Sequence, residues 1–199
     1  MQLLISLLVI LAIVLIPLIW GVGVYNRLVQ LRNRFKNAFA QIDVQLKRRH
    51  DLIPNLVEVA RKYMEHERDT LERVTAARAQ VMAATDLVKA KPLDNGPIKS
   101  LGLAEGVLAG AMGRFQATVE AYPELKADAR MQELSEELTH TENRIAFARQ
   151  LFNDVTLDYN NAAQQFPTNV VAGVFSFREA EMLQSTTQDS ERAPVAVKF

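Results

Sequence analysis

The sequence of 199 residues contains no cysteine. This absence excludes disulfide bonds, thiolate nucleophiles and zinc sites that use cysteine ligands. No serine lies in a Gly-x-Ser-x-Gly turn, and no glycine loop of the phosphate-binding type is present. The sequence therefore predicts a protein that is not an enzyme and that holds no cofactor.

Histidine is also scarce, with three residues in the chain. His66 is followed by Glu67 as in the zinc-protease motif, but the second histidine of that motif would fall at Thr70. Glu137 and His140 have the Glu-x-x-His spacing of di-iron bundles, which require a second copy that this chain lacks. We therefore predict no metal site, and a metal-dependent hydrolase is the least favoured function.

Charge of either sign is not in excess, because 23 Lys and Arg residues balance 23 Asp and Glu residues. A chain with zero formal net charge has no global field that would attract nucleic acid, so any electrostatic attraction must be local. The sequence predicts no nucleic-acid partner.

Residues 3–24 carry no charge, and this length is sufficient for a helix to cross a hydrocarbon core of about 30 Å. A cleaved signal peptide would have a positive segment before a shorter apolar core, whereas Met1 and Gln2 alone precede this run. Trp20 and Tyr25 are placed as interfacial aromatics, and Pro17 falls inside the span. We therefore expect residues 1–26 to form a transmembrane anchor.

Basic residues follow the apolar run closely: Arg27, Arg32, Arg34 and Lys36. Lys and Arg are enriched on the cytoplasmic side of a span, so we expect a single-pass protein with a cytoplasmic body. These four residues are candidate lipid contacts, because basic side chains near an anionic leaflet attract its headgroups. The alternative is that they only set topology and form a solvated face.

Beyond the anchor, apolar residues recur at helical steps of three and four up to Val81. The phase is the same on both sides of Pro54, which favours one long helix with a kink before Pro54 over a hairpin at that point. Residues 92–97 contain two prolines, an Asp-Asn pair and a glycine, and therefore predict a turn. The first helical segment is thus expected to end near Ala90.

A second helix is expected from Pro97 to Ala121, and a third from about Met131 to Phe166, with a short break at residues 122–126. Four glycines interrupt the second helix, which predicts either a weak helix or close approach of a partner helix. After Pro167, residues 170–177 are apolar but too short to span, and residues 178–183 are expected to add a turn or two of helix.

The resulting fold class is all-α: a transmembrane helix followed by an elongated antiparallel helical bundle. We expect the bundle to occupy residues 27–183, and residues 184–199 to form a flexible tail.

A basic cluster stands in the middle of the first long helix: Lys47, Arg48, Arg49 and His50. It lies too far from the span to contact lipid, so it is a candidate docking site for a partner protein. The alternative is a partly buried polar network with acidic residues of the third helix. Those acidic residues are Glu133, Glu136, Glu137 and Glu142.

Several stretches together resemble the LemA family. They cover nearly the whole chain and comprise Tyr25 to Asn26, Leu28 to Val29, Arg32 to Asn33, Gln41 to Val57, His66 to Glu67, Tyr122 to Lys126, Thr141 to Ile145, Ala148 to Arg149, Tyr159 to Asn160 and Phe166 to Met182. One departure is Phe152, where the family pattern suggests tyrosine before Asn153; loss of this hydroxyl casts doubt on a polar role at that point.

The resemblance implies a bacterial inner-membrane protein with one amino-terminal span, a helical bundle and no established enzymatic activity. It also implies links to membrane shaping in magnetosome-forming bacteria and to envelope quality control. Two functions follow as expectations. The first is a membrane scaffold that contacts lipid, self-associates as a homo-oligomer and organises or remodels the membrane. The second is an adaptor for another membrane protein, such as a protease or a sensor.

Overall fold

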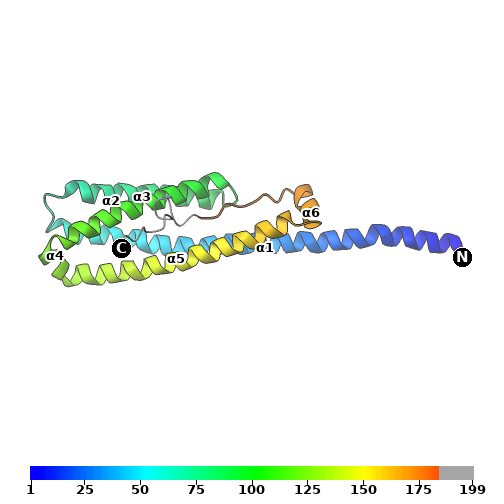
Figure 1. The fold of residues 1–199 in the computed structure, drawn as a ribbon, viewed down its shortest axis with the longest axis horizontal. Helices are drawn as coiled ribbons and strands as arrows, with labels where there is room; N and C mark the ends of the chain where they lie inside the picture. The colour runs from blue at the N-terminus through cyan, green and yellow to red at the C-terminus, as the bar shows by residue number, and fades with distance from the viewer. Residues whose placement is uncertain (184–199) are drawn as a thin grey trace, which may run out of the picture.

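The computed structural model describes residues 1–183, and this part of the chain is helical with no strand (Figure 1). The helices are α1 (Gln2–Arg61), α2 (Arg68–Ala90), α3 (Asn95–Glu120), α4 (Pro123–Ala127), α5 (Ala129–Gln164) and α6 (Thr168–Val174). The predicted all-α class is confirmed. The tail expected at residues 184–199 lies outside the described residues.

Helix α1 has two parts with different surroundings. Its apolar first third projects alone from the rest of the molecule (Figure 1), and an uncharged window long enough to cross a membrane lies there with none of its residues buried. The first fully buried side chain is Leu28. Because α1 is continuous from Gln2 to Arg61, the projecting segment and the body share one helix.

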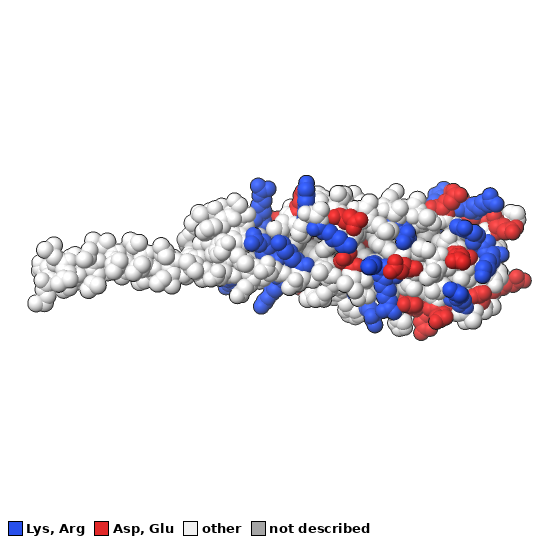
Figure 2. Space-filling view, turned by 180° about the vertical axis from the view of Figure 1, so that it is seen from behind, with Lys and Arg blue, Asp and Glu red and all other residues white. Residues whose placement is uncertain are grey.

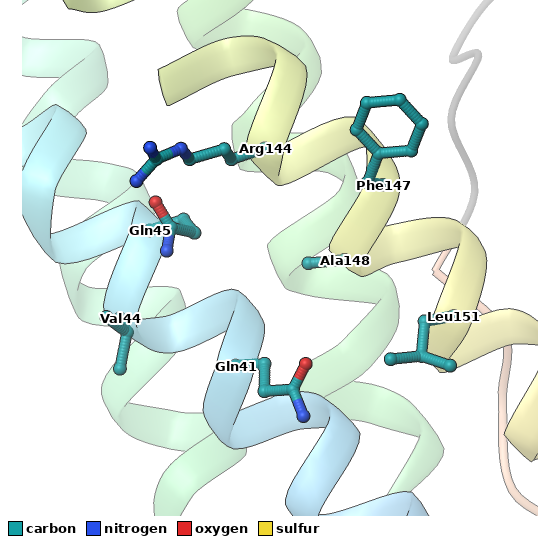
Figure 3. Close-up of a pocket in the computed structure, with 7 residues that line it drawn as sticks. All are labelled: Gln41, Val44, Gln45, Arg144, Phe147, Ala148 and Leu151. Carbon is teal, nitrogen blue, oxygen red and sulfur yellow. The ribbon is translucent and has the colours of Figure 1, made fainter. Parts of the chain in front are cut away.

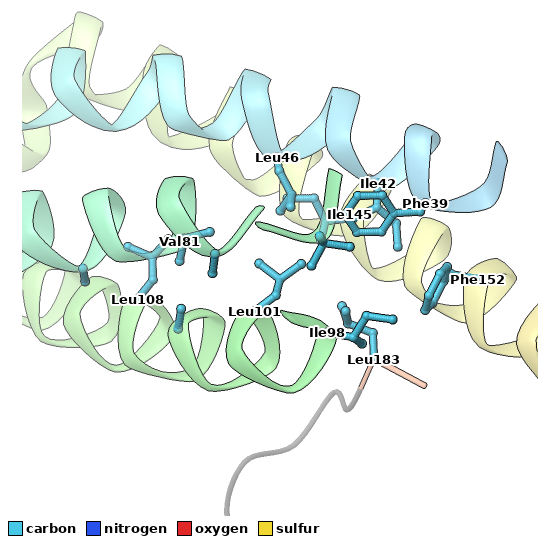
Figure 4. Close-up of a cluster of buried hydrophobic side chains, with 14 of the residues drawn as sticks. Phe39, Ile42, Leu46, Val81, Ile98, Leu101, Leu108, Ile145, Phe152 and Leu183 are labelled. Atoms are coloured by element: carbon cyan, nitrogen blue, oxygen red, sulfur yellow. The ribbon is translucent and has the colours of Figure 1, made fainter. Parts of the chain in front are cut away.

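The body is an elongated bundle of four long helices, in which α1 packs along α5 and α2 packs along α3. Phe35 and Phe39 of α1 contact Phe152 of α5, with ring centroids 4.9 and 6.1 Å apart. Side chains from all four helices meet in the core, as Figure 4 shows for Leu46, Val81, Leu101 and Ile145. Burial of each large apolar side chain stabilises the bundle by about 1.5–3 kcal/mol, and this is the main force that pairs the helices.

The chain reverses direction at residues 62–67, where one continuous helical segment to Ala90 was expected. Helix α1 does continue through Pro54, as the sequence predicts. The later break has no glycine or proline. Tertiary contacts hold it instead, because Met64 is fully buried and the Tyr63 hydroxyl donates a hydrogen bond to Asp128 Oδ2 at 3.0 Å.

Asp side chains begin the next two long helices. Asp94 accepts a hydrogen bond from Gly96 N at 3.2 Å, and Asp128 accepts one from Met131 N at 3.0 Å. Both bonds satisfy backbone donors that a helix start leaves without partners. The turn predicted before α3 is confirmed, whereas the break expected at residues 122–126 contains the short helix α4.

Residues 178–183 are not helical, although one or two further turns were expected there. Asn160 of α5 donates to Ala180 O and accepts from Ala180 N, both at 2.9 Å. Asn153 makes the same pair of bonds with Leu183, at 3.1 and 2.8 Å. Two asparagines that are two helical turns apart thus hold the segment extended along α5, and Leu183 reaches the core near Ile98 (Figure 4).

Candidate functional site

A buried ion network joins three helices at one level of the bundle. Glu105 of α3 forms ion pairs with Arg49 of α1 and Arg149 of α5, and Arg49 also donates a 3.0 Å hydrogen bond to Glu105 Oε2. Arg49 and Glu105 are only 3% and 6% exposed. The Glu105 carboxylate therefore compensates the charge of two guanidinium groups inside the protein. Without this carboxylate, the buried positive charges would strongly destabilise the fold.

Two further acids complete the network at its edge. Glu142 lies 3.4 Å from Arg49 Nη1, and Glu137 lies 2.7 Å from Arg48 Nη2. The second pair is exposed to solvent and adds little stability for that reason. The polar network considered in the sequence analysis is therefore present between the basic cluster and two of the four acids named there.

The pKa values of Arg49 and His50 shift in opposite directions. Desolvation acts to lower the pKa of Arg49, but hydrogen bonding and attraction from Glu105, with a contribution from Glu142, outweigh it and raise that pKa. Burial, together with the positive charge of Arg49, lowers the pKa of His50 to about 4. Arg49 is therefore charged and His50 neutral at pH 7.

The four residues of the candidate docking cluster divide into two groups. Lys47 and Arg48 face solvent, whereas Arg49 and His50 are buried. Docking at this cluster stays a prediction: Lys47 and Arg48 are open to solvent, and Arg49 borders a groove between α3 and α5. The division has a simple physical cause: four consecutive residues of a helix point in four directions, and this stretch crosses from the surface to the core.

The four candidate lipid contacts lie where the body of the protein begins. Arg27, Arg34 and Lys36 are exposed, while Arg32 is half-buried with its guanidinium 5.0 Å from the centre of the Phe177 ring. Figure 2 shows the projecting helix free of charged residues and basic side chains at the adjoining end of the body. Lys47 lies about 35 Å beyond Val24 at 1.5 Å per residue, which places it far from that end.

A groove runs between α3 and α5 and has a volume of about 930 Å³. The Arg49 and Glu105 side chains border it, and its α3 wall includes Gly102, Gly110 and Gly113. A Cβ atom built on any of these three glycines would meet nothing within 4 Å. The packing of this chain on itself therefore does not require glycine at those positions.

A second concave surface lies between α1 and α5, and we name it the α1/α5 pocket. Its volume is about 380 Å³, and its lining residues are Gln41, Val44, Gln45, Arg144, Phe147, Ala148 and Leu151 (Figure 3). Phe147 is 74% exposed and Val44 is 62% exposed. Oε1 of Gln45 is buried at this surface without a hydrogen-bond partner.

The remaining histidines lie at the surface. His66 is exposed, and His140 lies 3.7 Å from Glu136 Oε1 rather than beside Glu137. Within residues 1–183, no group of three or more His, Asp or Glu side chains is arranged to hold a metal ion.

Glu105 is the residue of the network that the sequence analysis missed. It follows Ala104 and lies four residues after Leu101, and all three are buried in α3. A buried carboxylate needs a charged partner. The position of Glu105 beside the apolar stripe of its helix was therefore the one feature of the sequence that could have indicated a buried ion pair.

These features define a class of protein: a helical bundle that continues from one candidate membrane-spanning helix, with an ion network inside and apolar pockets at its surface. The chain belongs to the LemA family, whose sequence profile matches residues 38–199.

Known relatives agree with this assignment. "Magnetosome protein MamQ 2" of Paramagnetospirillum magneticum is 26% identical over 175 residues, which cover 80% of this chain and 64% of the relative. "Protein LemA" of Metamycoplasma hominis is 25% identical over 165 residues, which cover 83% of this chain and 71% of the relative. The match thus spans just under two thirds of the MamQ protein, and neither relative is named as an enzyme.

Proposed function

We propose that this protein is a non-enzymatic, membrane-anchored scaffold that organises or remodels the membrane through self-association. The observation that carries the proposal is the α1/α5 pocket, where Phe147, Val44 and Leu151 expose apolar side chains on a bundle that already has a complete core. Exposed apolar side chains that gather at one concave surface are typical of protein interfaces. Relatives named as magnetosome proteins support a role at a membrane-bounded structure.

Charge supports a second copy of this chain as the occupant of the pocket. Copies anchored in one bilayer stand parallel, and a two-fold axis along the bundle places α1 of each copy beside α5 of the other. Near the pocket α1 carries Arg34 and α5 carries Asp154, and both side chains are exposed. The Phe35–Phe152 contact places Arg34 and Asp154 at about the same level, so opposite charges meet across such an interface.

We expect Phe147→Asp to weaken self-association of the full chain by at least about tenfold, because a buried aromatic anchor typically contributes 2 kcal/mol or more to an interface. The measurement is energy transfer between differently labelled copies in phospholipid vesicles at increasing dilution by lipid. Leu103→Asp is the matched control, since Leu103 is 67% exposed on α3 and lies outside both pockets. If both variants self-associate equally strongly, the α1/α5 pocket is not the interface between copies.

The α3/α5 groove favours a second candidate function, an adaptor for another membrane protein. Three glycines on the groove wall lower helix stability without serving internal packing, and they would allow a partner helix to approach α3 closely. The self-association experiment separates the two functions. A wild-type chain that is monomeric at every lipid dilution would exclude the scaffold and leave the adaptor.

We also propose that the body lies on the cytoplasmic side of the inner membrane, with α1 as a single-pass anchor. A carboxyl-terminal reporter that is active only in the cytoplasm should be active, and one that requires export should be inactive. Replacing Arg27, Arg34 and Lys36 by glutamine and adding lysines after Met1 should reverse this result, because flanking basic residues set orientation. Activity of the exported reporter alone on the unsubstituted chain would refute the topology.

A further inference from the structure

Helix α6 lies at the end of the bundle where the apolar part of α1 leaves it (Figure 1). The Phe175 ring lies 4.8 Å from the Tyr25 ring, and the Phe177 ring lies 5.6 Å from it, measured between centroids. Tyr25 directly follows the uncharged run of residues 3–24. Helix α6 is therefore level with the boundary between the projecting segment and the body.

One side of the α6 segment is packed and the other is open. Ala172 and Phe177 are buried against the bundle. On the open side, Val174 is 73% exposed, Val170 58% and Phe175 56%, and Phe166 at the corner before α6 is 83% exposed. Val170, Val174 and Phe166 thus face away from the protein, and Phe175 is more than half exposed although its ring contacts Tyr25. These side chains lack most of the stabilisation that burial would provide.

The surroundings of this surface contain no charge along the chain. Residues 159–177 lack Asp, Glu, Lys and Arg, and the first charged residue after them is Arg178, which is exposed. On α1, the exposed Arg27 is two residues beyond Tyr25. An uncharged apolar surface with cations at its edge is typical of segments that lie in the interfacial region of a bilayer.

We propose that α6 and the corner around Phe166 insert into the interfacial region of the leaflet that α1 enters, with Val170, Val174 and Phe175 in contact with lipid. The bilayer is the occupant because α1 must enter it at the level of Tyr25, and Phe175, which directly follows α6, packs against that residue. This inference rests on the proposed anchoring of α1.

Insertion of α6 has a consequence for the proposed membrane remodelling. Two protein segments would occupy the near leaflet, while α1 alone would occupy the far one. A wedge in one leaflet expands it relative to the other and favours curvature. The body would also be fixed at two points, which would hold it at one tilt relative to the membrane.

The absence of cysteine allows a direct test with single labels on the full chain. Val174→Cys is labelled with an environment-sensitive fluorophore and reconstituted in vesicles of phosphatidylcholine and phosphatidylglycerol. Phosphatidylcholine brominated on its acyl chains then quenches labels that contact lipid, and aqueous iodide quenches labels that contact water. We expect brominated lipid to quench position 174 severalfold more strongly than a label outside the membrane.

Two further positions calibrate this experiment. Val107→Cys on α3 is the matched control outside the membrane, because Val107 is also an exposed valine, at 53%. Ile13→Cys in the projecting part of α1 reports on the anchor itself. Quenching by lipid at position 13 but not at position 174 would overturn this inference and leave the anchoring intact, whereas no quenching at position 13 would reject the anchoring.

A third outcome identifies a different occupant of the surface. If position 174 is protected from both brominated lipid and iodide, protein covers α6, and the inference is overturned in favour of a second copy of the chain. Self-association is measured separately, in the energy-transfer experiment with Phe147→Asp. The quenching result at position 174 can therefore be interpreted without it.

Discussion

Replacing Glu105 by glutamine is expected to reduce the free energy of unfolding by about 3–5 kcal/mol, the usual cost of leaving buried charges uncompensated. Arg49 and Arg149 both pair with this carboxylate. Glu142, the other acid near Arg49, is 3.4 Å away and half in solvent, so it cannot replace Glu105. For a body of this size the loss corresponds to a fall of roughly 6–20 °C in the unfolding midpoint, measured by circular dichroism of the full chain in detergent.

Glu137→Gln is the matched control, because Glu137 also pairs with an arginine of α1 but does so at the surface. Its expected cost is below about 1 kcal/mol. A triple replacement of Arg49, Glu105 and Arg149 by methionine, leucine and methionine should recover most of the loss, since an apolar substitute removes the unpaired charges. Equal stability of the Glu105→Gln and Glu137→Gln variants would show that the network does not compensate buried charge.

The long helices could be predicted from the sequence because apolar spacing and turn chemistry both report on local structure. The Asp-Asn-Gly-Pro stretch marked the start of α3, and Asp94 caps that helix. The reversal at residues 62–67 was hidden because seven residues separate Met64 from Leu71, which is close to two helical turns. Periodicity keeps its phase across such a gap, so only the tertiary contacts of Tyr63 and Met64 distinguish a turn from a continuous helix.

The extended segment near the end of the described chain was missed for a similar reason. Nothing in residues 178–183 forbids helix, and their conformation is set by Asn153 and Asn160 on α5. The absence of a tyrosine hydroxyl at Phe152 argued against a polar role at this point of the sequence. Phe152 packs in the core against Phe35, while Asn153 supplies the polar contact through its amide.

The candidate site was predicted in part. Arg48 and Arg49 form ion pairs with acids of α5, as expected from the alternative in which the basic cluster belongs to a polar network between helices. The burial of Arg49 depends on Glu105, which lies 56 residues further along the chain and on another helix. Such a pairing depends on how the helices assemble, and a single sequence does not contain that information.

The stability of the bundle should also fall in acid because of His50. This side chain is 6% exposed, its Nε2 atom has no hydrogen-bond partner, and burial next to Arg49 lowers its pKa from 6.5 to about 4. Arg78 and Asp51 also act on it, in opposite directions, and Glu105 raises its pKa. The net result is a histidine that stays neutral in the folded protein.

The sign of the effect follows from proton binding. Between pH 6.5 and about 4 the unfolded chain binds a proton at His50 and the folded chain does not, so the free energy of unfolding falls as pH decreases through this window. The full contribution is present above pH 6.5, and the loss from this group reaches about 3 kcal/mol near pH 4. We expect His50→Gln to remove this component, because glutamine does not titrate.

Carboxylates also contribute to acid denaturation, so the informative quantity is the difference between wild type and His50→Gln. Chemical unfolding of both chains at pH 7 and at pH 4 gives that difference, which should change by about 3 kcal/mol between the two pH values. His140→Gln is the control, because this side chain is 70% exposed. Parallel stability curves for wild type and His50→Gln would mean that His50 gains its proton in the folded protein as easily as in the unfolded chain.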